Sequence, residues 1–115
     1  MSCDYSKAIS GTANPLTITV QPGQTHVETW DWSGCVDGAG RQLRITSVNF
    51  ALSTKAKDRF LTITAALDGV NQPILNRHVV MADVTGKLFR LFFVVSKQAK
   101  QPASVGVSYS CNVGG

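Results

Sequence analysis

Side chains suited to catalysis are few and widely spaced in this chain of 115 residues. Its two histidines, His26 and His78, belong to no metalloprotease or nucleophile-elbow motif. Catalytic partners meet in space and not in sequence, so a dyad of Cys35 with either histidine stays open. Asp31 and Asp37 could pair as acid and base in a glycosidase, but a chain of 115 residues without a sugar-cleft architecture argues against it. Two carboxylates are also too few for a calcium site. We therefore predict no enzymatic activity, no small-molecule substrate, no cofactor and no metal.

The three cysteines, Cys3, Cys35 and Cys111, are far apart and form no close metal-ligand spacing. Three reduced thiols fit a protein that stays in the cytoplasm, where thiols are usually reduced. A disulfide involving two of the three, within the chain or between subunits, fits a protein that leaves the cell. Both interpretations stay open.

Trp30 and Trp32 are two residues apart, so in a strand they share one face. Tryptophans arranged in this way can stack on a sugar ring or a base, with Asp31 and Asp37 near the site. They can equally anchor a core or an interface.

Charge is divided unevenly along the sequence. Residues 1–40 hold one base and four acids, whereas residues 41–115 hold ten bases and three acids. A strongly basic segment favours an acidic partner such as nucleic acid.

Length and composition predict one domain over residues 1–115. The chain is 43% hydrophobic and 16% charged, so we expect its surplus apolar surface to lie in subunit contacts. No apolar run approaches the roughly 18 residues that span a bilayer, and residues 1–12 lack the features of a secretory signal. These observations predict no membrane association. They also indicate either that the protein is made and used in the cytoplasm or that the sequence is that of a mature protein.

Short β-branched and aromatic runs alternate with turn residues, and no long stretch has helical periodicity. The sequence predicts a mostly β protein, an antiparallel sheet or sandwich of about seven strands with little or no helix. The expected strands are Leu16–Val20, Thr25–Trp32, Gln42–Leu52, Phe60–Leu67, Ile74–Met81, Leu88–Val95 and Val105–Ser110.

Alternation of residue types predicts which strands are neighbours and which are buried. Runs 42–52 and 60–67 each have one apolar and one polar face, and we expect them to form a hairpin with a basic tip. Run 88–95 is apolar on both faces except at Arg90, which predicts a central strand covered on both sides.

A basic sheet face is the most informative candidate site. Arginine and lysine neutralise phosphates, while threonine and asparagine add hydrogen bonds to phosphate, sugar or base edges. An ordinary solvated face with surface bases is the alternative, and Asn76 with His78 could replace Arg77 on it. The predicted RNA-binding residues are Arg44, Thr46, Lys55, Lys57, Arg59, Thr62, Thr64, Arg77 and Arg90.

The succession Gln42–Ser47, a basic turn, Asp58–Thr64 and then a long apolar strand resembles the coat proteins of small single-stranded RNA bacteriophages. The resemblance covers about residues 42–95. It implies intertwined dimers that tile an icosahedral shell and bind genomic RNA on the inner sheet face. That family ends in two helices, whereas residues 102–111 alternate like a strand.

The sequence therefore predicts a virion coat protein, assembled in the host cytoplasm, whose partners are itself and single-stranded RNA. A dimer formed by sheet extension would be its building block. Three alternatives remain. The first is a decoration or cement protein of a tailed phage, and the second is a carbohydrate-binding β-sandwich of the lectin type. The third is a β-domain whose excess of basic residues is incidental.

Overall fold

The computed structural model describes residues 11–12, 16–36, 38–54, 59–86 and 88–114. These residues form nine β-strands and no helix, so none of them lies in a helix that could cross a membrane. The strands are β1 (Gly11–Thr12), β2 (Leu16–Val20), β3 (Thr25–Asp31), β4 (Arg44–Thr54), β5 (Leu61–Leu67), β6 (Val70–Gln72), β7 (His78–Thr85), β8 (Leu88–Val95) and β9 (Ala103–Gly114). The predicted antiparallel all-β class is confirmed.

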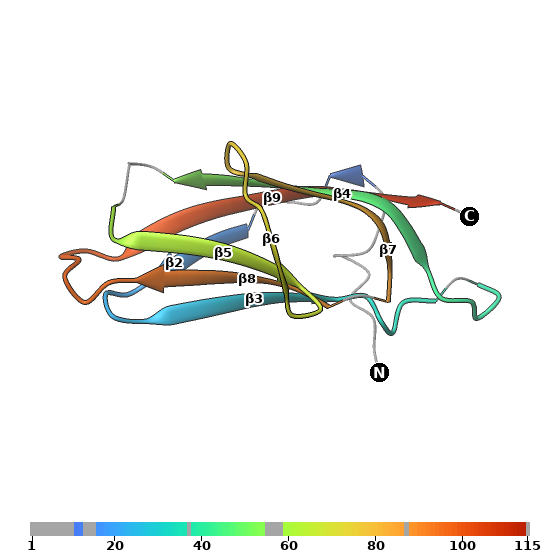
Figure 1. Ribbon diagram of the computed structural model, residues 1–115, viewed down its shortest axis with the longest axis horizontal. Helices are drawn as coiled ribbons and strands as arrows, with labels where there is room; N and C mark the ends of the chain where they lie inside the picture. The colour runs from blue at the N-terminus through green and yellow to red at the C-terminus, as the bar shows by residue number, and fades with distance from the viewer. Residues whose placement is uncertain (1–10, 13–15, 37, 55–58, 87, 115) are drawn as a thin grey trace.

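Two antiparallel sheets pack face to face in an elongated sandwich of 51 × 25 × 24 Å (Figure 1). The first sheet has the order β1-β9-β4-β7, and β2 also pairs with β9. The second sheet has the order β3-β8-β5-β6. Because the chain passes repeatedly from one sheet to the other, strands that are consecutive in sequence are mostly not paired.

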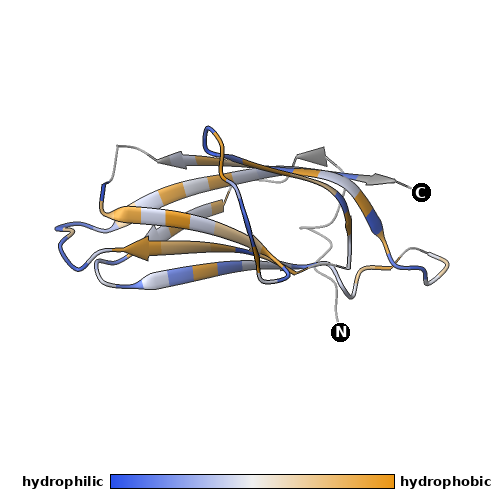
Figure 2. Cartoon of the chain, viewed as in Figure 1, coloured by the Kyte–Doolittle hydropathy of each residue, from blue (hydrophilic) through white to orange (hydrophobic). Residues whose placement is uncertain are grey.

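Each sheet buries one face because its strands alternate between apolar and polar residues. In Figure 2 this alternation appears along β5 as successive orange and pale segments. Val105, Val107 and Tyr109 of β9 point inward from the first sheet, and Phe89 and Phe93 of β8 point inward from the second. Burying each such side chain contributes about 1.5–3 kcal/mol, so this shared core holds the sheets together.

The predicted strand positions are correct where the alternation is regular. The predictions for β2 and β8 match residue for residue, and those for β3 and β5 differ by one residue at one end. The prediction Ile74–Met81 is shifted, because Asn76 and Arg77 form a two-residue turn with φ values of 51° and 63°. Leu75 and His78 close that turn with two reciprocal backbone hydrogen bonds of 2.9 Å, and β7 begins at His78.

The predicted hairpin of runs 42–52 and 60–67 is wrong. Strand β4 lies in the first sheet between β9 and β7, whereas β5 lies in the second sheet between β8 and β6. The alternation in each run indicates only that one face of that strand is buried. Two strands that face each other across the core meet this condition as well as two paired strands do.

The prediction of a central strand at 88–95 is confirmed, since β8 lies between β3 and β5. Its expected burial on both faces is not observed within the chain. Phe89, Leu91 and Phe93 are fully buried, but on the other face Phe92 is half-buried and Val94 is 40% exposed.

Candidate nucleic-acid interface

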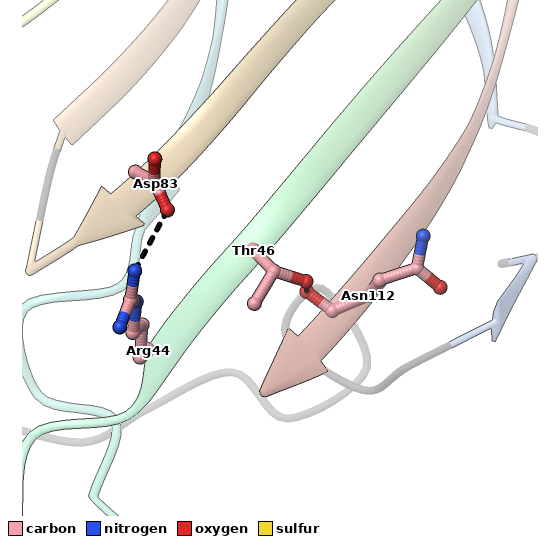
Figure 3. Close-up of polar contacts among 4 residues, drawn as sticks. All are labelled: Arg44, Thr46, Asp83 and Asn112. Atoms are coloured by element: carbon pink, nitrogen blue, oxygen red, sulfur yellow. Dashed lines mark hydrogen bonds and ion pairs between the residues drawn. The ribbon is translucent and has the colours of Figure 1, made fainter. Parts of the chain in front are cut away.

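The residues predicted to form one basic sheet face are distributed over several parts of the molecule. Arg44 begins β4 in the first sheet, and its Nη2 lies 2.9 Å from Oδ1 of Asp83 in β7 (Figure 3). Thr46 occupies an irregularity in β4, where its hydroxyl donates to the backbone oxygen of Asn112 at 3.0 Å. Arg77 lies in the turn before β7. The predicted constellation is therefore not formed.

Thr62, Thr64 and Arg90 do share a surface, the outer face of the second sheet. Thr62 is opposite Val94, Thr64 is opposite Phe92, and Arg90 is opposite Ala66. Strand pairs directly opposite each other place their side chains on the same face. Arg90 thus stands among threonines and apolar side chains, so this face is not a basic surface.

A different group of cations gathers at one end of the sandwich. Arg59, Lys97 and Lys100 are exposed there, on the segments that precede β5 and follow β8. The backbone N–H of Ser96 donates to the carbonyl oxygen of Phe60 at 3.0 Å, which fixes these two segments side by side. We call the loops 21–24, 59–60 and 96–102 the basic end.

The turn at residues 21–24 completes the basic end. The Gly23 N–H donates to the carbonyl oxygen of Val95 at 2.9 Å, and Val95 N–H donates to that of Gln24 at 3.1 Å. Gly23 has φ of 78°, and a Cβ there would lie 3.2 Å from Cγ of Lys97. The turn therefore needs glycine for its backbone conformation, and a side chain there would also crowd the stem of Lys97.

All charged side chains described in the loops of the basic end are positive. The described residues of these loops include no acidic side chain, and they add the amide groups of Gln21, Gln24, Gln98 and Gln101. The Arg59 guanidinium lies 5.0 Å from the ring centroid of Phe60, a cation–π contact that orients it. The same loops form the blue end of the molecule on the left of Figure 2. Charge and amide donors of this kind suit phosphate groups.

Acidic residues lie at the opposite end of the second sheet. Asp31 ends β3, and Asp68 follows β5 and accepts from the Leu88 N–H at 2.9 Å. Hydrogen bonds from the hydroxyl and the backbone N–H of Ser33 lower the pKa of the Asp31 carboxyl. These two carboxylates are thus separated from the basic end along the long axis.

Lys97 and Lys100 were not among the predicted RNA-binding residues. The sequence does show two lysines three residues apart in a turn-rich segment. Their proximity to Arg59, however, depends on the pairing of β8 with β5. Of the predicted basic tip, Arg59 belongs to the basic end, whereas Lys55 and Lys57 lie outside the described residues.

The tryptophan pair is not a stacking platform. Trp30 and Trp32 are 0% and 1% exposed, and Trp30 packs against Phe50 with ring centroids 4.9 Å apart. The interpretation of Trp30 and Trp32 as core residues is confirmed, and the proposed sugar site loses its aromatic surface. Asp37 lies outside the described residues.

The cysteines provide no catalytic dyad in the described part of the chain. Cys35 is disulfide-bonded, which removes its thiol as a nucleophile for His26 or His78. Cys111 carries a buried thiol in β9, and Cys3 lies outside the described residues. His26 contacts Glu28, with Nε2 and Oε2 2.9 Å apart. No group of three potential metal ligands occurs among the described residues.

Fold and site together define a two-sheet antiparallel β-sandwich with a basic end. No protein-family model, no curated protein and no solved structure matches this chain.

Proposed function

We propose that this chain is a non-enzymatic, self-assembling structural subunit of a virion, and that its basic end binds RNA. The observation that carries the proposal is the group formed by Arg59, Lys97 and Lys100 on loops joined by backbone hydrogen bonds. The basic end thus replaces the sheet face as the expected site of phosphate contacts.

The hydrogen bonds between the loops strengthen this proposal. They join the three loops of the basic end through the main chain, so the backbone needs little further ordering when a polyanion arrives. Loops at the narrow end of an elongated subunit can also project toward the interior of a shell while the long faces contact neighbouring subunits. Among the described residues, the cations outside the basic end are scattered.

RNA binding is tested by filter retention of labelled poly(U) at a series of salt concentrations. A triple variant, Arg59→Gln with Lys97→Gln and Lys100→Gln, is compared with Arg44→Gln combined with Arg77→Gln and Arg90→Gln. Both variants have the same net charge, so a difference between them reports the position of the charges.

We expect the basic-end variant to lose most of its affinity. The slope of log affinity against log salt should fall by about 2, since each lost phosphate contact contributes about 0.7 for single strands. The control variant should stay close to wild type. Equal losses in both variants would contradict the assignment to the basic end.

Self-assembly is tested by size-exclusion chromatography of nuclease-treated protein, followed by negative-stain microscopy of the excluded peak. The proposal expects uniform shells with a nucleic-acid absorbance spectrum. A small oligomer without nucleic acid would contradict it and favour the decoration-protein alternative, which is then tested by binding to preformed capsids.

A further inference from the structure

Strand β7 forms an open edge of the first sheet. It pairs with β4 on one side, and within the described part of the chain its other side meets only the bridge from His78 to Leu75. Val80 is 68% exposed, and Ala82 is exposed beside it. An open edge carries backbone donors and acceptors that another strand can use.

Hydrogen-bond alternation shows which β7 groups point outward. The Leu52 N–H donates to the Arg77 carbonyl at 2.9 Å, so residues 79 and 81 direct their polar groups toward β4. His78 directs its own groups the other way, where they bond Leu75. Val80 and Ala82 follow the alternation of His78 and therefore present N–H and C=O groups at the open edge.

The side chains along this flank of the sandwich are unusually apolar. Val70, Leu75 and Val80, at 64%, 70% and 68% exposure, are the three most exposed large hydrophobic side chains of the described residues. All three lie on β6, β7 or their connection. By contrast, β3, another strand that ends a sheet among the described residues, carries the polar side chain of His26 and the carboxylate of Glu28, and charged side chains discourage strand addition.

Charges at the two ends of this edge favour a second copy as the partner. Arg77 directly precedes β7 and Asp83 lies near its end, and the Asp83 side chain is 72% exposed although it pairs with Arg44. A two-fold axis makes paired β7 strands antiparallel, which brings the Arg77 end of one copy toward the Asp83 end of the other. The edge is therefore electrostatically complementary to itself.

We propose that the chain forms a two-fold dimer in which the β7 edges of two copies pair antiparallel, through the backbone groups of Val80 and Ala82. This pairing joins two first sheets into one continuous sheet. It deepens the self-assembly part of the proposed function, but it does not depend on RNA binding.

The dimer is tested by sedimentation equilibrium of the full chain over a range of concentrations, after nuclease treatment and at a salt concentration that dissociates larger particles. Ala82→Pro removes an outward N–H without removing a bond to β4, and proline is tolerated at such edge positions. The matched control is Val27→Pro. The pairing of Gln24 with Val95 places Val27 at an outward position on the β3 edge.

We expect wild type and Val27→Pro to dimerise alike, and Ala82→Pro to dimerise roughly 10- to 100-fold more weakly, because two symmetric hydrogen bonds are lost. Val80→Lys leaves the backbone unchanged and should weaken the dimer as well. This variant replaces Ala82→Pro as the test if Ala82→Pro does not fold. A monomeric wild type, or a dimer that tolerates both β7 substitutions, would overturn the proposal. A wild-type protein that dimerises but does not bind RNA would instead contradict only the proposal that the basic end binds RNA.

Discussion

Phe50 of β4 and Phe89 of β8 stack with ring centroids 4.5 Å apart and planes 21° from parallel. They belong to different sheets, and both are fully buried. Tyr109 continues the stack, with its ring centroid 5.5 Å from that of Phe50. This aromatic column ties the two sheets together at the centre of the sandwich.

Replacing Phe50 by alanine should lower the free energy of unfolding by about 3–5 kcal/mol, because it removes a large buried ring and leaves a cavity between the sheets. Urea denaturation followed by tryptophan fluorescence measures the loss. Phe92→Ala is the control, since Phe92 is half-buried on the outer face of the second sheet. Equal losses in the two variants would contradict the central role of the column.

The ion pair of Arg44 with Asp83 should contribute little to stability. Its side chains are 56% and 72% exposed, and exposed pairs are worth about 0–1 kcal/mol. Arg44→Ala should therefore change the unfolding free energy by less than about 1 kcal/mol, and by still less in concentrated salt. A loss well above that limit, measured by denaturant unfolding at low and high salt, would assign the pair a structural role.

Stability should fall in alkaline solution because of Cys111. Burial raises the pKa of its thiol above the ordinary value of 9.0. Between the two values the unfolded chain releases a proton that the folded chain retains, so stability is full below about pH 9 and decreases as pH rises further. Melting temperatures of wild type and Cys111→Ala across this range measure the effect. The alanine variant should show the shallower decrease, and identical slopes would contradict the assignment.

Cysteine chemistry should differ between Cys35 and Cys111. When the unreduced protein is denatured and alkylated, peptide mapping should find the label on Cys111 and none on Cys35. Reduction before unfolding should cost about 2–4 kcal/mol, as is usual for a disulfide that closes a loop. Alkylation of Cys35 without a reductant would show that the bond is absent in solution.

Much of the fold could be predicted from the sequence, because alternation reports burial directly. Leu61, Ile63, Ala65 and Leu67 face the core side of the second sheet as their spacing requires. In β4 the alternation changes at Thr46, so Ile45 and Val48 are both buried despite a spacing of three. Residue types alone do not specify such an irregularity.

The candidate site could be predicted only in part, since it depends on which strands pair. Arg44 and Arg90 both alternate with apolar neighbours and so look equivalent in sequence, yet they lie in different sheets. Lys97 and Arg59 are separated by a long stretch of chain and meet because β8 pairs with β5. A long-range pairing of this kind leaves little signal in a single sequence.

The position of β9 has a consequence for biosynthesis. Its residues 103–114 lie in the middle of the first sheet, between β4 and the pair β1 and β2. On a translating ribosome, β2 and β4 therefore have no common partner until this segment has left the exit tunnel. Folding dominated by such distant pairings is slow, typically milliseconds to seconds, so nascent chains would expose apolar strands during that interval.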